Sequence, residues 1–115
     1  MKVLVCGDRL WNTYEPIHTR LARLPKDTVI IHGAARGADT LAWSAAINLG
    51  LQVISVPAEW DKHGKKAGPI RNLKMLDMKP DLVIAFHKDL SRSKGTLHTL
   101  QNALKREIRV EVHSR

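Results

Sequence analysis

The stretch "IIHGAARGADTLA", residues 30–42, places two glycines and an arginine between an aliphatic run and an alanine-rich run. Aliphatic residues, then a glycine-containing loop, then helical spacing are typical of a strand–loop–helix unit whose loop amides can cradle phosphate. The helix is expected to start near Asp39 or Thr40. The loop is not a Walker A motif, because no Gly-Lys-Ser/Thr follows, and it is not G-x-G-x-x-G. Taken alone, it is a weak indication of a phosphate site.

The same alternation runs through the chain of 115 residues. Short aliphatic runs predict five strands, at residues 3–5, 28–31, 53–56, 82–86 and 108–112. Apolar residues at helical spacing predict four helices, with stripes at Ile17/Leu21/Leu24, Leu41/Ala45/Leu49, Ile70/Leu73/Leu76 and Leu97/Leu100/Leu104. The positions of proline and glycine agree with these helices. Pro69 suits the first position of a helix, Gly50 suits a C-terminal cap, and Pro80 would end a helix.

This order predicts one domain, residues 1–115, with an α/β fold. We expect a three-layer sandwich in which helices cover both faces of a five-stranded, mainly parallel sheet. The first four runs lack polar alternation, which is typical of strands covered on both faces. Ligands of such sheets bind beyond the carboxyl ends of the strands.

The amino-acid composition limits the classes of partner that are expected. The net charge of +8, from 19 Lys and Arg against 11 Asp and Glu, favours an anionic partner such as a nucleotide, a nucleic acid or a membrane surface. No apolar stretch approaches the ~20 residues of a membrane span, and no signal peptide is recognised, so a cytoplasmic protein is expected. A single cysteine excludes an internal disulfide, and the six histidines lack paired metal spacing. We therefore expect no metal and no cofactor.

Basic residues and glycines gather where the predicted strands end. A positive charge at a helix start opposes the helix dipole, so a repeated pattern on one sheet edge indicates a bound anion. The predicted ligand-binding residues are Gly7, Arg9, Gly33, Ala34, Arg36, Gly37, Asp39, Trp60, Gly68, Arg71, Asn72, Gly95 and Thr96.

Structural roles compete with these assignments. Gly33 and Gly37 would also suit a tight turn, and Arg36 would also pair with Asp39 or Asp61. Asp39 is at least as well suited to capping a helix as to touching a ligand.

Three further residues carry alternatives of their own. Arg71 lacks a dipole rationale, which favours a ligand role. Asn72 fits a helix start or contact with a base or ribose equally well. Trp60 would either stack on a base or plug the core.

With these residues assembled, the sequence resembles the YspA-like branch of the SLOG superfamily, a Rossmann-like group that includes LOG phosphoribohydrolases and DprA DNA-processing proteins. The resemblance rests on "VLVCGDR", "IIHGAARGADTLA", "VPAEW", "GKKAGPIRNLKML" and "PDLVIAF" followed by "SKGT", in that order. It implies a nucleotide-derived ligand at the carboxyl edge of the sheet. Similar short forms occur in phage and mobile elements.

The sequence departs from the LOG motif at the catalytic position. Arg71 matches the LOG arginine and Gly95-Thr96 match its Gly-Thr, but Thr99 stands where the glutamate belongs. A threonine cannot supply a carboxylate's charge, so phosphoribohydrolase activity is not expected and no catalytic residue is assigned.

The hypothesis is binding of a mononucleotide or an ADP-ribose-like ligand, for sensing or sequestration. Two alternatives stay open. One is N-glycosidic hydrolysis of nucleoside monophosphates, with Asp39, Glu59 or Asp61 replacing the glutamate. The other is DprA-like binding of single-stranded DNA, supported by the charge but weakened by scarce aromatic residues. A homo-oligomer also stays open, with Trp11 or Trp43 either at its interface or in the core.

Overall fold

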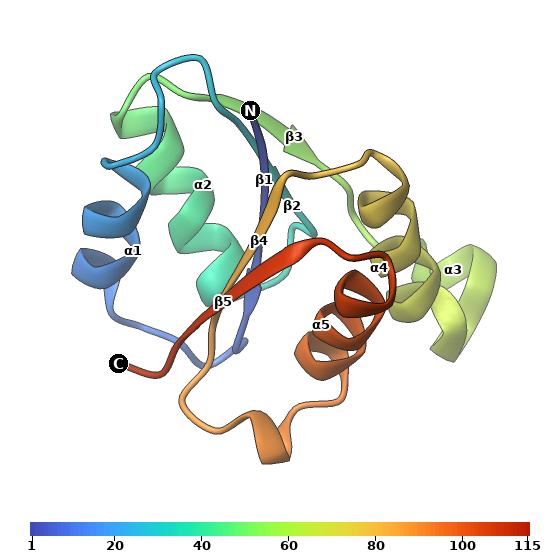
Figure 1. The fold of residues 1–115 in the computed structure, drawn as a ribbon. Helices are drawn as coiled ribbons and strands as arrows, with labels where there is room; N and C mark the ends of the chain where they lie inside the picture. The colour runs from blue at the N-terminus through green and yellow to red at the C-terminus, as the bar shows by residue number, and fades with distance from the viewer.

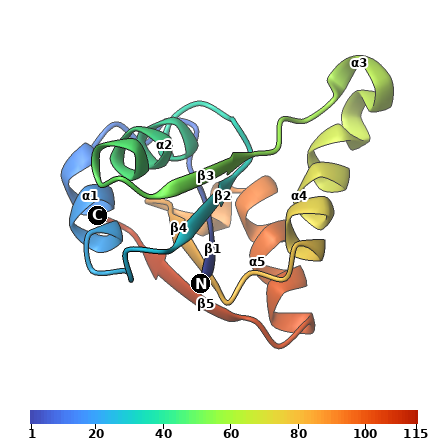
Figure 2. The ribbon, with the colours of Figure 1, turned by 90° about the horizontal axis from the view of Figure 1, so that it is seen from above.

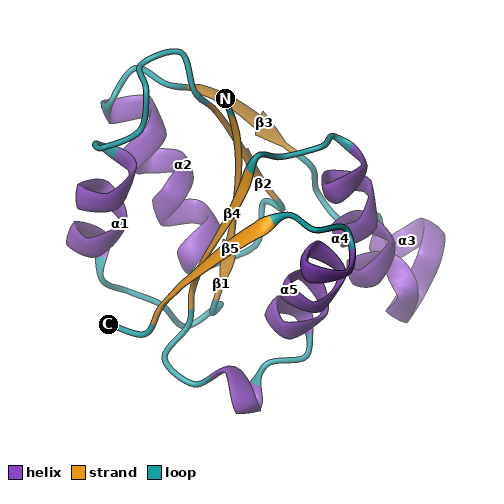
Figure 3. Cartoon of the chain, viewed as in Figure 1, coloured by secondary structure: helices purple, strands orange, loops and turns teal.

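The computed structural model describes residues 1–115 and contains one sheet of five strands. The strands are β1 (Lys2–Gly7), β2 (Val29–His32), β3 (Gln52–Ser55), β4 (Leu82–Phe86) and β5 (Arg109–His113). The helices are α1 (Tyr14–Leu21), α2 (Ala38–Asn48), α3 (Trp60–His63), α4 (Ala67–Asp77) and α5 (Gly95–Lys105), with 3₁₀ turns η1 (Gly64–Lys66) and η2 (Leu90–Arg92). The predicted α/β fold is confirmed (Figure 3).

Every strand pair is parallel, and the strand order is β3-β2-β1-β4-β5. The sheet is therefore wholly parallel, where the sequence predicted a mainly parallel one. The chain builds outward from β1 through β2 to β3, then returns to the other side of β1 for β4 and β5. The order reverses between β1 and β4, and such a switch point leaves a crevice beyond the carboxyl ends of the strands.

Helices cover both faces of the sheet, with α1 and α2 on one face and α4 and α5 on the other (Figures 1 and 2). Successive residues of β1 alternate between the two cores: Val3 and Val5 pack in the same cluster as Ile17 and the alanines of α2. Leu4 and Cys6 point the other way and pack in the same cluster as α4 and α5. This alternation explains why β1 and β4 read as continuous apolar runs.

The expected burial of β3 on both faces is wrong. Ile54 is 39 % exposed, and Gln52 and Ser55 are also exposed. β3 is an edge strand, and an aliphatic run does not encode its position within a sheet.

Two predicted helix stripes are rotated relative to the faces that are buried. In α4, Ile70 is exposed, whereas Asn72 and Met75 are buried. In α5, Leu104 is exposed and Thr99 is buried. Both helices turn polar side chains inward near the carboxyl edge of the sheet, and a stripe of apolar residues cannot reveal polar residues that are buried for another reason.

The polar segment after β3, where the sequence predicted no helix, forms α3 and η1. α4 already begins at Ala67, so Pro69 lies third in the helix and not first. Gly50 caps α2 as predicted, with φ 74°. Figure 2 shows α3 projecting beyond the sheet layers.

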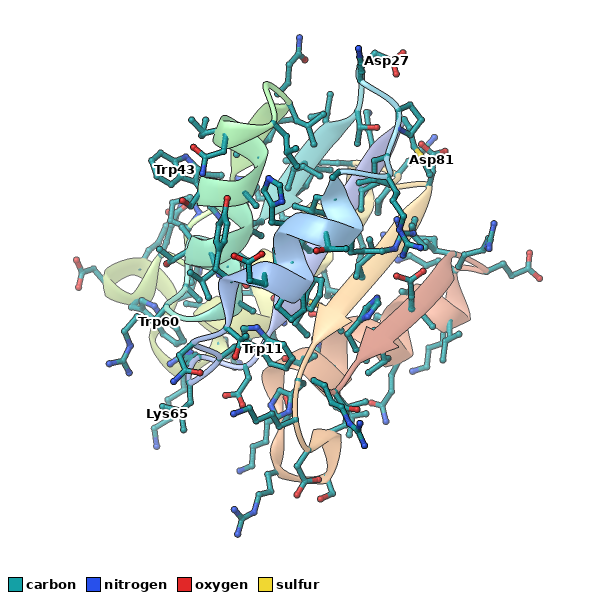
Figure 4. All side chains as sticks on the ribbon, turned by 90° about the vertical axis from the view of Figure 1, so that its left-hand side faces the viewer. Trp11, Asp27, Trp43, Trp60, Lys65 and Asp81 are labelled. Atoms are coloured by element: carbon teal, nitrogen blue, oxygen red, sulfur yellow. The ribbon has the colours of Figure 1, made fainter.

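The three tryptophans differ in environment. Trp11 is 2 % exposed and packs edge-on against Phe86, so it belongs to the core. Trp43, on α2, and Trp60, on α3, are each about half exposed. Figure 4 shows Trp60 and Lys65 near one end of the molecule and Asp27 and Asp81 at the opposite end. None of the helices has the length and apolar character that crossing a membrane requires.

Candidate functional site

Three adjoining pockets lie along the carboxyl edge of the sheet. The arginine pocket, about 320 Å³, is lined by Arg9, Gly33, Ala34, Ala35, Arg36, Pro57, Ala58, Trp60 and Arg71. The inner pocket, about 60 Å³, is lined by Cys6, Gly7, Arg9, Ala35, Asp39, Arg71, Asn72, Met75, Gly95, Thr96 and Thr99. The β4–α5 pocket, about 360 Å³, is lined by Gly7, Asp8, Arg9, His87, Arg92, Ser93, Lys94, Gly95 and Thr96. Arg9 lines all three, so the pockets adjoin one another, and together they are called the trench. The inner pocket lies at the switch point between β1 and β4.

Arg71 links α4 to the loop after β2. Its Nη1 donates to the carbonyl oxygen of Gly33, and its Nε donates to Oδ1 of Asn72 over 2.9 Å. A Cβ at Gly33 would lie 2.4 Å from Nη1 of Arg71, so a side chain there would displace the guanidinium from this position. Gly33 therefore holds the arginine at the boundary of the arginine pocket and the inner pocket.

Asp39 lies in the first turn of α2 but is buried, at 5 % exposure. Its Oδ2 accepts from the amide of Gly33 over 2.8 Å and, at 3.4 Å, from that of Ala35. Burial raises the pKa of Asp39 to about 6, against the opposing effects of these two amides and of Arg71 and Arg9. The carboxylate thus folds the loop back on itself, and it forms no ion pair.

His32, at the end of β2, fixes the other side of this loop. Its Nδ1 accepts from the amide of Ala34 over 3.0 Å, and its Nε2 lies 2.7 Å from Oγ of Ser55. Because Nδ1 accepts, Nε2 carries the proton and donates to the serine. Ala34 consequently keeps a left-handed backbone with φ 56°. Burial lowers the pKa of His32, which favours this neutral form.

The outer wall of the arginine pocket carries charge and an aromatic ring. The guanidinium carbon of Arg9 lies 6.0 Å from the ring centroid of Trp60, within the range of a cation–π contact. Arg36 is exposed and pairs with neither Asp39 nor Asp61, although the sequence allowed both. No carboxylate lines this pocket.

The turn into α5 closes the far side of the inner pocket. The amide of Thr96 donates to Oγ of Ser93 over 3.0 Å, and Oγ1 of Thr99 donates to the carbonyl oxygen of Gly95 over 3.2 Å. Burial raises the pKa of the neighbouring thiol of Cys6, so this cysteine remains a thiol.

The structure brings nearly all of the predicted site residues to the trench. Gly37 and Gly68 are the exceptions. Gly37, with φ 72°, packs against the backbone of Asp8 and Arg9 at the start of α2, where a Cβ would clash at 2.3 Å. Gly68 lies under Trp60, where a Cβ would be 3.5 Å from the ring. Trp60 does not plug the core.

Sequence reasoning missed several residues of the site. Ala35, Pro57 and Ala58 line the arginine pocket, and His32 accepts a hydrogen bond from the amide of Ala34, another residue of its lining. Their types carry no signature of binding, and only their position directly after strands would have pointed to them. Of the carboxylates proposed to replace the LOG glutamate, Asp39 lines the inner pocket, whereas Glu59 and Asp61 are exposed on or beside α3 and line none of these three pockets.

Comparison with known proteins gives consistent matches. The model of the family described as YspA, cpYpsA-related SLOG matches residues 1–63. The Gene 61 protein of Mycobacterium phage D29 is 36 % identical over 118 residues, which cover 95 % of this chain and 93 % of that protein. The X-ray structure of DNA processing protein A (DprA) from Streptococcus pneumoniae matches with a TM-score of 0.81 at 23 % identity, over 96 % of this chain and 49 % of DprA. This chain therefore spans about half the length of DprA, and that likeness shows the fold.

Proposed function

This chain belongs to the YspA, cpYpsA-related SLOG family, whose members are associated with nucleotide-related ligands, and on that premise we propose that it binds a nucleotide-derived ligand in the trench. The finer proposal is a mononucleotide or an ADP-ribose-like molecule, bound for sensing or sequestration. The observation that carries it is the arginine pocket, where Arg9, Arg36 and Arg71 face one space beside the exposed Trp60.

Each part of that pocket has a chemical counterpart in a nucleotide. Three guanidiniums without a carboxylate among the lining residues favour an anion, and arginine matches phosphate oxygens with paired donors. The ring of Trp60 offers a face for stacking a base, and Arg9 already lies against that ring. The pocket's volume, about 320 Å³, is at the lower end of the range for small-molecule sites.

The proposal is one of binding without an assigned reaction. Thr99 stands at the position of the LOG glutamate. Its hydroxyl donates a hydrogen bond to the carbonyl oxygen of Gly95, and it has no carboxylate. Asp39 is the carboxylate of the inner pocket, and its Oδ2 is held by two backbone amides.

Thermal unfolding with a panel of AMP, NAD, ADP-ribose and cyclic nucleotides tests the proposal. A ligand at a hundred times its dissociation constant adds about 2.7 kcal/mol to the native state, which moves the midpoint by several degrees in a domain of this size. Arg36→Ala is the sharpest variant, because this exposed side chain has no ion pair to lose, and it should remove most of the shift.

Two further variants make the result specific. Arg71→Ala should also remove the shift, but it loses bonds to Gly33 and Asn72 as well. Arg23→Ala removes the same charge from an exposed position after α1, outside all three pockets, and should leave the shift intact. A panel without any shift, or equal loss in Arg23→Ala and Arg36→Ala, would refute nucleotide binding in this pocket.

Single-stranded DNA binding is the second candidate, favoured by a specific observation. Lys62, Lys65 and Lys66 are exposed on α3 and η1, next to Trp60, so the positive surface continues past the arginine pocket. A short oligothymidylate therefore belongs in the same panel.

A further inference from the structure

The carboxylate of Asp39 has one oxygen left over. Both hydrogen bonds from backbone amides are accepted by Oδ2, and Oδ1 accepts no hydrogen bond within the protein. Thr28 Oγ1 is the one fully enclosed side-chain atom without a partner, so Oδ1 of Asp39 is still reachable. Because Asp39 is 5 % exposed and lines the inner pocket, that pocket is the space its free oxygen faces.

A carboxylate oxygen in this position selects for hydrogen-bond donors. At the free oxygen itself a phosphate oxygen would be repelled by like charge, whereas a neutral group with an O–H or N–H would be held. Arg9 and Arg71 also line this pocket and stay available to a phosphate beside it. The arginine pocket, which has no carboxylate, is the place where the trench favours phosphate. The two pockets therefore divide the ligand into an anionic part and a neutral, donating part.

The size and the other walls of the inner pocket narrow the donor further. At about 60 Å³ it is far smaller than the arginine pocket, so it admits a small group and not a base. Its other polar lining residues include Thr96, Thr99 and Asn72. A hydroxyl both donates and accepts, which suits a space shared by a carboxylate and these groups.

The way in which the two pockets adjoin agrees with an anionic part and a neutral part of one ligand. Arg9 and Arg71 line both pockets, so a phosphate held by them lies next to the inner pocket. In a nucleotide the sugar joins the phosphate to the base. A sugar at the mouth of the inner pocket, with one hydroxyl inside it, is compatible with a phosphate at the arginines and a base beside Trp60.

We propose that Asp39 reads a ring hydroxyl of the ligand's ribose, so that the trench selects nucleotides that carry this hydroxyl over nucleotides that lack it. This inference rests on the proposed function. It adds that the free oxygen of Asp39 accepts a hydrogen bond from the hydroxyl, and that the discrimination comes from leaving this oxygen unpaired when the hydroxyl is missing.

Titration calorimetry with AMP, 2′-deoxyAMP and 3′-deoxyAMP tests the inference. Wild type should bind AMP about 10- to 100-fold more tightly than at least one of the deoxy analogues, the range expected for a hydrogen bond to a charged group. Asp39→Ala should bind all three with similar affinity. Asp27→Ala, which removes an exposed carboxylate at the opposite end of the molecule, should keep the wild-type preference (Figure 4).

The wild-type ranking decides the question even if Asp39→Ala fails to fold. Equal affinity for AMP and both deoxy analogues overturns the inference while leaving nucleotide binding in place. Weaker binding of inosine monophosphate with equal binding of the deoxy analogues also overturns it, since the base amino group would then be the donor that is read. If wild type binds no nucleotide of the panel, the proposed function fails together with this inference.

Discussion

At the scale of single residues, the site depends on the absence of a side chain at Gly33 and on the buried carboxylate of Asp39. The missing side chain of Gly33 gives Arg71 its place, and the carboxylate of Asp39 folds the loop after β2 from within. The sequence marks both positions, because Gly33 follows a strand directly and Asp39 lies where the next helix is expected to start. It does not show which group fills the space beside Gly33, since Arg71 comes from a helix 38 residues later in the chain.

The buried carboxylate of Asp39 makes stability depend on pH in a predictable direction. Its pKa is raised from 3.8 to about 6 in the native state, so between these values the native protein keeps a proton that the unfolded chain has released. The free energy of unfolding should therefore fall as pH rises through this window. The size of the effect is about 3 kcal/mol if the full shift is realised.

Urea unfolding of wild type and Asp39→Asn at about pH 4 and about pH 7 measures this contribution. His32, whose pKa is lowered, changes stability in the opposite direction, and Glu111 titrates at lower pH, but both are common to the two proteins and cancel in the difference. Wild type should lose stability relative to Asp39→Asn on going to pH 7. Parallel changes in the two proteins would show that the carboxylate is not perturbed.

At the scale of elements, the sequence is most informative where burial is complete. β4 matches its predicted run, residues 82–86, because all five side chains are buried and every position is apolar. The predictions fail where a segment's surroundings decide its structure. β3 is apolar yet lies at an edge, α4 and α5 bury polar side chains that line the trench, and α3 forms in a polar segment that propensity alone leaves open.

Because Trp60 lies on α3, outside the core, its substitution should affect ligand binding without affecting stability. Trp60→Ala should leave the free energy of unfolding within about 1 kcal/mol of wild type, because the side chain is 49 % exposed and packs outside both cores. The same variant should lose most of the nucleotide-induced rise in the unfolding midpoint, since the base loses its stacking surface.

Trp11→Ala provides the contrast within the same protein. Trp11 is 2 % exposed, packs against Phe86 with ring centroids 5.7 Å apart and donates from Nε1 to the carbonyl oxygen of Thr13. Its removal should cost about 3–5 kcal/mol by chemical denaturation. A comparable loss of stability in Trp60→Ala would contradict the placement of α3 outside the core.

At the scale of the whole molecule, parallel topology is what assembles the site. All five strands point their carboxyl ends to one edge, so residues from the loops after β1, β2, β3 and β4 meet there although the sequence separates them widely. This convergence was predictable from the alternation of strands and helices. The proposed division of the trench into a phosphate side and a neutral side was not predictable, because the proposal depends on the free oxygen of Asp39.

The net charge of +8 raises the question whether the ligand is one nucleotide or a polymer. The arginine pocket is a local site, whereas the lysines at 62, 65 and 66 lie outside all three pockets. Replacing these three lysines by alanine together should therefore leave the affinity for AMP within about twofold of wild type, since a phosphate held by the arginines is screened from more distant exposed charges.

A single-stranded DNA ligand would behave differently in the same measurements. Its affinity would fall with salt at a slope of about −0.7 per neutralised phosphate in a double logarithmic plot, and each contacting lysine would add to that slope. Titration of wild type and the triple lysine variant with AMP and with oligothymidylate, from about 50 to about 200 mM salt, separates the two cases. A steep slope for oligothymidylate that flattens in the triple variant, with AMP unbound, would mean that the basic edge reads a polymer's backbone. A shallow slope for AMP that is shared by both proteins and lost in Arg36→Ala places recognition in the arginine pocket.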